Sequence, residues 1–150
     1  MKKICFMMLS LMLSACGEDT SPKDYLKFAG GGLVFNYRYS QASLIVIAQQ
    51  KSPLPEGSIV EAQFDLPGTL LRQTVTLPAM TGKLTYKLQS GPLTQITKGG
   101  RYNVTIRLID SKGVELDRKD KIFESDENQS TLPTKPLADG VTMKPHLENL

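Results

Sequence analysis

The chain has 150 residues, and 18 Lys and Arg face 15 Asp and Glu, which gives a formal net charge of +3. This length supports one domain with its own core. A charge so close to neutrality excludes the strong electrostatic attraction on which nucleic-acid binding depends.

The first predicted element is a targeting segment. Lys2 and Lys3 precede an apolar run over residues 4–12, and Leu13-Ser14-Ala15-Cys16 follows it. A run of about a dozen residues is shorter than the roughly 20 that a membrane-spanning helix needs. The pattern resembles the signal peptide and lipobox of bacterial lipoprotein precursors. This resemblance implies cleavage between Ala15 and Cys16, lipid on the Cys16 thiol and an acylated new amino terminus. The alternative is that Cys16 lies beside an ordinary signal cleavage site.

The lipoprotein resemblance implies an address in the cell envelope, facing the periplasm. Gly17 follows the cysteine in place of the aspartate that in some enteric bacteria signals inner-membrane retention, which favours the outer membrane. Cys5 would leave with the signal peptide, so the mature chain would have no thiol for a disulfide. Without residues 1–15 the charged residues are 16 basic and 15 acidic, and no nucleic-acid partner is expected.

We divide the chain into a signal peptide (1–15), a lipidated tether (16–23), a folded domain (24–125) and a proline-containing extended tail (126–150). Apolar and polar residues alternate with the period of two that indicates half-buried strands. The alternating runs are residues 33–40, 60–66, 71–77, 84–89 and 102–108. Residues 44–48 form a continuous apolar run that suits a strand covered on both faces, although a turn of buried helix would read the same way.

The alternation also predicts which side chains face the core. We expect Tyr37 and Tyr39 to continue the buried face of the first strand, and Leu84 to point inward. Glu61 and Thr105 fall on the opposite, outward face of their strands. Gly30-Gly31-Gly32 lacks the spacing and the following helix of a phosphate-binding loop. We interpret the glycines as a flexible lead into the first strand or as a bulge.

The last two strands form a predicted hairpin. Asp110-Ser111-Lys112-Gly113 supplies the turn, with glycine where a positive φ is needed. Residues 114–123 return as the partner strand, and the charged run over residues 117–121 suits an exposed sheet edge. The phase of the apolar residues slips between Leu116 and Phe123, which predicts a bulge near Arg118.

Seven strands without a long helical period predict an all-β fold, a single immunoglobulin-like antiparallel β-sandwich. The run Gly99-Gly100-Arg101-Tyr102-Asn103-Val104 resembles the start of the penultimate strand of immunoglobulin-like domains. That resemblance implies that Tyr102 bonds back to upstream backbone. The disulfide and core tryptophan usual in immunoglobulin domains are absent.

A second resemblance covers roughly residues 53–116, and it consists of turn-and-strand patterns. The order Leu54-Pro55-Glu56-Gly57, then Arg72-Gln73-Thr74-Val75, then Leu84-Thr85-Tyr86-Lys87-Leu88 and Arg101-Tyr102 resembles small outer-membrane lipoproteins related to type III secretion pilotins. It implies a β-sandwich on a lipid anchor that escorts a secretin-type partner to the outer membrane. The segment before residue 53 does not follow this family's usual opening.

Motifs for catalysis are not found in the sequence. His146 is the single histidine and falls in the tail, and no Gly-x-Ser-x-Gly, Walker or His-Glu-x-x-His pattern occurs. Five carboxylates near the end of the domain are candidate calcium ligands, but lysines and arginine are interleaved among them, and a solvated charged edge is the favoured interpretation. These carboxylates are Asp117, Asp120, Glu124, Asp126 and Glu127. We therefore predict no enzyme activity, no cofactor and no metal site.

The predicted function is a lipid-anchored, non-enzymatic binding or assembly module of the cell envelope. Its expected partners are the membrane, through the lipid on Cys16, and an envelope protein that contacts a sheet edge or the tail. The tail places Pro133, Pro136 and Pro145 among scattered apolar residues. It either lies along the sandwich as a final covering strand or stays loose to capture a partner. The alternatives are a pilotin-like chaperone and an envelope hydrolase that uses paired carboxylates.

Overall fold

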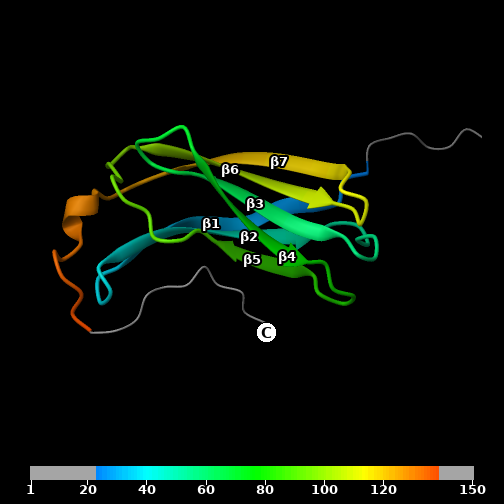
Figure 1. Cartoon of the computed structure of the whole chain (residues 1–150), viewed down its shortest axis with the longest axis horizontal. Helices are drawn as coiled ribbons and strands as arrows, with labels where there is room; N and C mark the ends of the chain where they lie inside the picture. Colours follow the sequence, from blue (N-terminus) through cyan, green and yellow to red (C-terminus); the bar gives the residue numbers. More distant parts are fainter. Residues whose placement is uncertain (1–22, 139–150) are drawn as a thin grey trace, which may run out of the picture.

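The computed structural model describes residues 23–138, which form a β-sandwich (Figure 1). A short 3-10 helix, η1, covers Gln129–Thr131 after the last strand. The seven strands are β1 (Leu26–Asn36), β2 (Gln41–Gln50), β3 (Ile59–Asp65), β4 (Arg72–Pro78), β5 (Thr85–Gln89), β6 (Arg101–Ile109) and β7 (Glu115–Glu124).

The strands form two sheets that pack face to face. One sheet has the order β1-β2-β5 and the other the order β4-β3-β6-β7, and every neighbouring pair is antiparallel. The predicted all-β antiparallel sandwich of seven strands is confirmed. The fourth strand pairs with the third, whereas in constant-type immunoglobulin domains it joins the sheet of the first two strands.

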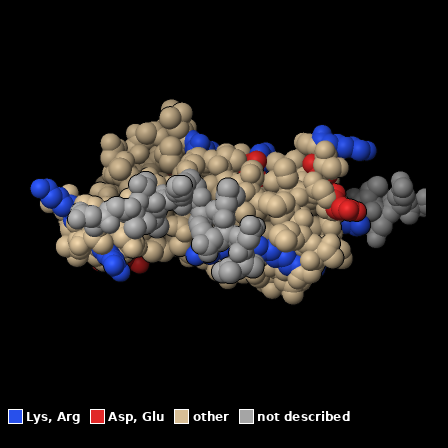
Figure 2. Space-filling view, turned by 60° about the horizontal axis from the view of Figure 1, so that its bottom comes forward, with Lys and Arg blue, Asp and Glu red and all other residues tan. Residues whose placement is uncertain are grey.

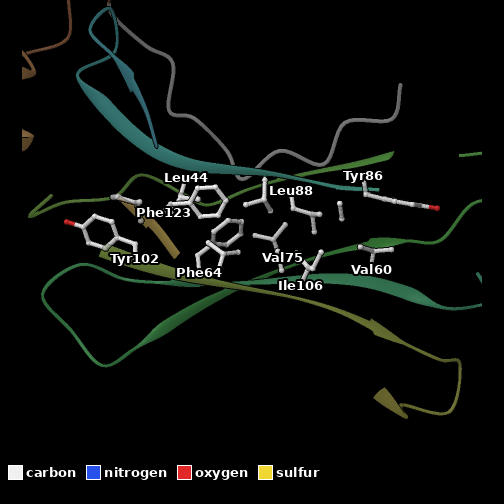
Figure 3. Packing of buried hydrophobic residues seen from close by; sticks show 14 of the residues in the cluster. Leu44, Val60, Phe64, Val75, Tyr86, Leu88, Tyr102, Ile106 and Phe123 are labelled. Carbon is white, nitrogen blue, oxygen red and sulfur yellow. The ribbon is translucent and has the colours of Figure 1, made fainter. Parts of the chain in front are cut away.

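The core lies between the two sheets and is built by alternate residues of each strand (Figure 3). The fully buried residues Leu44, Val46 and Leu88 come from one sheet, and Phe64 and Ile106 come from the other. Burying one such side chain contributes about 1.5–3 kcal/mol. Leu44, Val46 and Ala48 are buried with the period of two of a strand, so residues 44–48 form part of β2 and not a turn of helix.

Two buried tyrosines have their hydroxyl groups at opposite ends of this core (Figure 3). The Tyr102 hydroxyl accepts a hydrogen bond from the Thr97 backbone N–H at 3.1 Å, which is the backward bond that the immunoglobulin resemblance implied. The Tyr86 hydroxyl accepts one from the Met80 backbone N–H, also at 3.1 Å. Each phenol is therefore buried with its polar atom satisfied.

The first strand is longer than predicted, because it includes the three glycines. The register of β1 against β2 shifts between Phe28 and Gly30, which is a bulge. Gly31 has φ +146°, and a Cβ at this position would lie 2.5 Å from the Ile45 carbonyl oxygen. Only glycine fits there. The strand ends at Asn36, so Tyr37 and Tyr39 lie in the turn to β2 and do not continue a buried face.

One predicted side-chain direction is wrong, and two residues on outward positions are buried against expectation. Leu84 precedes β5 and is 61% exposed, because the strand begins only at Thr85. Glu61 and Thr105 do lie on the outward face of their sheet, but they are 7% and 0% exposed. Long side chains from neighbouring strands cover that face, which a pattern along one strand does not reveal.

The hairpin of β6 and β7 has the predicted turn. Gly113 has φ +83°, and the Asp110 carboxylate accepts hydrogen bonds from the backbone N–H groups of Lys112 and Val114. Strand β7 is an edge strand, as predicted. The register shift lies at Leu116, which has no partner in β6, and not at Arg118. Asp117, the next residue, binds the backbone at the start of β1.

Candidate functional site

The predicted lipidation site, Cys16, and the cleavage position Ala15 lie outside the described residues. His146 and Pro145 of the tail lie outside them as well. Among residues 23–138, no helix is long and apolar enough to cross a membrane. The lipobox therefore stays a prediction, and the structure bears on it only through the way the chain enters the sandwich.

The chain enters at the end of the sandwich that we call the tether end. The connections over residues 51–58, 79–84 and 110–114 lie at this end, which is on the right in Figure 1. The connections over residues 37–40, 66–71 and 90–100 lie at the opposite end, which we call the far end. Because all strands are antiparallel, successive connections alternate between the two ends.

Asp117 holds the first residues of β1 in place. One of its carboxylate oxygens accepts hydrogen bonds from the backbone N–H groups of Tyr25 at 2.9 Å and Leu26 at 2.8 Å. The other oxygen accepts from the Arg118 N–H and the Lys119 ammonium, both at 2.8 Å. The Asp117 side chain is only 6% exposed, and four charge-assisted bonds stabilise its negative charge there. We call this arrangement the β1 clamp.

Exposed ion pairs extend the β1 clamp toward the tether. Asp24 forms ion pairs with Lys51 and with Lys119, the latter at 3.0 Å. The hydrogen bonds from Lys51 and Lys119 lower the pKa of the Asp24 carboxyl. The bonds to Asp117 and Asp24 raise the pKa of Lys119. The last residues before the sandwich therefore leave it in a direction fixed by several side chains.

The outward face of the β4-β3-β6-β7 sheet carries a connected array of charged and polar groups. Arg107 donates to Glu61 at 2.9 and 2.5 Å and to Glu115 at 3.0 Å. Arg118 also donates to Glu115, at 2.9 and 3.0 Å. The bond to Glu61 raises the pKa of Arg107, and the bond from Arg118 lowers the pKa of Glu115. These pairs explain why Glu61 can be buried on an outward face.

A second arginine continues this array. Arg72 donates to Asp65 at 2.8 Å, to the Gln63 side chain at 3.0 Å and to the Thr105 hydroxyl at 2.9 Å. The Thr105 hydroxyl in turn donates to Asp120 at 2.5 Å. The array therefore pairs Glu61, Glu115 and Asp65 with arginines and does not leave two of these carboxylates facing each other.

Two shallow pockets lie at the tether end. The first has a volume of about 180 Å³ between the connections over residues 51–58 and 79–84, and Glu56 is the one acidic residue in its lining. The second lies beside the β1 clamp and is lined by Asp24, Glu115 and Asp117. Each of these three carboxylates is ion-paired with lysine or arginine.

The candidate calcium ligands predicted from the sequence are not brought together. Glu124 ends β7, while Asp126 and Glu127 follow it and are exposed. Asp117 belongs to the β1 clamp. In the described part of the chain, no three His, Cys, Asp or Glu side chains are placed as ligands of one metal ion.

The described part of the tail packs against the far end. Gln129 donates its backbone N–H to the Ile96 carbonyl at 2.8 Å, and Leu132 is buried. The Ser40 hydroxyl donates to the Pro133 carbonyl, and the Leu137 N–H donates to the Arg38 carbonyl at 2.8 Å. As far as residue 138, the tail thus contacts the turn between β1 and β2 and adds no strand to either sheet.

The β4–β5 side of the sandwich, which we call the open side, contrasts with the side where β1 meets β7. On the open side, the Gly91 N–H donates to the Gln73 side chain at 2.8 Å and so joins the two sheets. Strand β4 pairs only with β3, and β5 pairs only with β2. Leu70 and Leu71 are exposed just before β4, and Met80 is exposed just after it. Sequence reasoning anticipated a sheet edge as an interface but did not identify which one.

No family model and no curated protein matches the chain. Among solved structures it resembles a family 76 glycoside hydrolase from a bovine Bacteroides thetaiotaomicron strain, with 14% identity and a TM-score of 0.45 over 67% of this chain and 20% of that one. It also resembles OgpA from Akkermansia muciniphila, catalytically inactive in complex with an O-glycopeptide substrate, with 12% identity and a TM-score of 0.39 over 74% and 31% of the two chains. For wild-type OgpA from Akkermansia muciniphila the identity is 14% and the TM-score is 0.38, over 79% of this chain and 32% of that one.

These matches contradict the prediction that the protein is not an enzyme, because they include a glycoside hydrolase and a protein crystallised with its substrate. The chain spans about a fifth to a third of the length of those chains. At these identities and TM-scores the likeness assigns no substrate and no catalytic residue to this chain. The pilotin resemblance stays a prediction.

Proposed function

We propose that this protein is a lipid-anchored binding module of the cell envelope. It is attached to the membrane through Cys16, and its sandwich faces the periplasm, with the outer membrane as the favoured location. The observation that carries the proposal is the β1 clamp. Asp117, a buried carboxylate, binds the backbone of Tyr25 and Leu26, so the direction in which the chain leaves toward Cys16 is fixed.

A fixed direction matters for a protein on a short tether. Residues 16–23 span at most about 3.3–3.6 Å each when extended, so the tether end stays within a domain's length of the membrane. An unclamped first strand would let the sandwich lie in any orientation. With the β1 clamp, the tether end faces the membrane, and the far end and the open side face the periplasm.

The proposed partner site is the open side, because it combines unpaired strand edges with exposed apolar residues. Leu70, Leu71 and Met80 are all more than half exposed. Exposed apolar groups beside an open edge favour protein binding over simple solvation. A partner bound there would be held beside the membrane by the lipid on Cys16.

Metabolic labelling with radioactive palmitate tests the anchor. The chain offers a matched pair of variants, Cys16→Ser and Cys5→Ser. We expect Cys5→Ser to be processed and labelled as the unaltered protein is, because Cys5 leaves with the signal peptide. Cys16→Ser should carry no label and should accumulate as precursor. Normal processing and labelling of Cys16→Ser would refute the proposed lipid attachment.

A further inference from the structure

The two sides of the sandwich are protected very differently. Where β1 meets β7, the rings of Phe28 and Phe123 meet edge to face with centroids 6.2 Å apart. The Lys121 ammonium lies over both rings, at 5.9 and 5.2 Å. The β1 clamp adds hydrogen bonds, and β7 carries a run of charged residues over 117–121. Charge of this kind keeps an edge strand from pairing with other chains.

The free edge of β4 can be assigned residue by residue. Ala79 donates its N–H to the Ser58 carbonyl, and Leu66 donates to the Leu71 carbonyl. These bonds set the alternation of an antiparallel ladder. In the register of β3 against β4, Gln73, Val75 and Leu77 therefore point their backbone groups toward β3.

The intervening residues present their backbone groups to the outside. Thr74 and Thr76 have their N–H and C=O groups on the free edge of β4, and no described residue bonds to them. The next outward position is Pro78, which has no N–H to offer. The free edge thus presents a short stretch of donors and acceptors centred on Thr74 and Thr76.

Between Arg72 at its start and Pro78 at its end, this edge has no charged residue and no proline to prevent strand pairing. Residues 73–78 include no charged side chain, whereas the neighbouring edge strand β5 carries Lys87 at its centre. Thr74 and Thr76 are exposed β-branched residues, which favour extended backbone. Such an edge is a template for one more strand.

The charge around the edge indicates the kind of strand that fits. Residues 66–89, which form β4, β5 and their connections on the open side, contain no Asp or Glu. Arg72 is ion-paired with Asp65, so Lys83 and Lys87 are the basic residues of this segment that attract an acidic strand. Figure 2 turns the lower side of Figure 1, which carries β5 and the β4–β5 connection, toward the reader, and both basic and acidic side chains are visible in this view. A strand rich in Asp or Glu is therefore favoured over a basic one.

We propose that β4 binds an extended acidic segment of a partner protein by strand addition. The outward N–H and C=O groups of Thr74 and Thr76 bond to the main chain of that segment. Leu70 and Leu71 contact apolar side chains at one end of it, and Lys83 and Lys87 attract its carboxylates. This inference deepens the proposed function, since it names the chemistry of the partner and the strand that receives it.

The test uses the purified protein without its signal peptide, residues 16–150 and free of lipid, and a fluorescent octapeptide of alternating Val and Glu. Fluorescence anisotropy is measured against the unaltered protein and against Thr74→Pro and Thr76→Pro. Each proline removes an outward N–H and leaves the bonds from β4 to β3 intact. We expect each proline to weaken binding at least tenfold. The matched controls, Thr74→Val and Thr76→Val, keep the N–H and should bind within twofold of the unaltered protein.

A second peptide, with Lys in place of Glu, tests the charge preference and should bind at least tenfold more weakly than the acidic one. Thermal melting monitored by circular dichroism checks that the proline variants remain folded. The double variant Leu70→Ser, Leu71→Ser gives an independent reduction in binding without altering any backbone group.

Several outcomes would overturn the inference. Equal binding by the proline variants would exclude β4, and equal binding of the Lys peptide would exclude an acidic partner. A dimer that Thr74→Pro dissociates would assign the edge to a second copy of this chain. Stronger peptide binding after removal of residues 139–150 would assign it to the chain's own C-terminal segment. None of these results depends on lipid attachment, so they are distinguishable from failure of the palmitate experiment.

Discussion

The β1 clamp predicts a large and specific cost for Asp117→Ala. The carboxylate accepts four bonds of 2.8–2.9 Å, two of them from the backbone N–H groups of Tyr25 and Leu26 at the start of β1. Hydrogen bonds to a charged group contribute roughly 1.5–3 kcal/mol each, and part of this is recovered when water reaches the freed groups. We therefore expect Asp117→Ala to lower the free energy of unfolding by about 3 kcal/mol.

Urea denaturation followed by circular dichroism measures this loss. With a dependence on urea of about 1.5 kcal/mol/M, the midpoint should fall by about 2 M. The control Asp126→Ala removes an exposed carboxylate just after β7 and should change stability by less than about 0.5 kcal/mol. A loss of less than about 1 kcal/mol for Asp117→Ala would show that the clamp does not fix β1 and would refute the reasoning.

Two further predictions concern backbone space and pH. Gly31→Ala should lower the free energy of unfolding, measured by thermal melting, by about 2 kcal/mol or more, because a Cβ there lies 2.5 Å from the Ile45 carbonyl oxygen. The control Gly32→Ala should be tolerated, because a Cβ at position 32 meets no atom within 4 Å. Arg118 holds the pKa of the Glu115 carboxyl below its ordinary 4.5. The ionised Glu115 carboxylate therefore contributes its full stabilisation above about pH 4.5, and this stabilisation is lost as the pH falls through the lowered pKa. Glu115→Gln should reduce the loss of stability on acidification, and an unchanged acid titration would contradict this ion pair.

The strands were predictable where alternate residues face the core between the two sheets. Alternation from Tyr102 to Leu108 identified β6, and the turn chemistry at Gly113 identified the hairpin that follows. The bond from Thr97 to Tyr102 was implied by the immunoglobulin resemblance. These features depend on local sequence alone.

The outward face of the four-stranded sheet was not predictable in this way. Glu61 and Thr105 occupy outward positions and are nevertheless buried, because Arg107 and Arg72 from other strands cover them. The role of Asp117 depends equally on a strand 91 residues away in sequence. Alternation gives the direction of a side chain relative to its own strand, and it gives no information on which neighbour reaches over it.

The candidate binding edge depends on strand order, which the sequence does not specify. The absence of acidic residues over 66–89 is visible in the printed sequence, but it gains meaning only when β4 is known to be an edge. That assignment comes from the pairing of β4 with β3 alone.

The central claim, that β4 accepts an additional strand, is tested most directly by amide hydrogen exchange measured residue by residue by NMR. The rates are compared with and without the octapeptide of alternating Val and Glu. We predict that the amides of Thr74 and Thr76 exchange rapidly in the free protein and become protected when the peptide is bound. Unchanged exchange at both amides under saturating peptide, or protection confined to β7, would contradict the account.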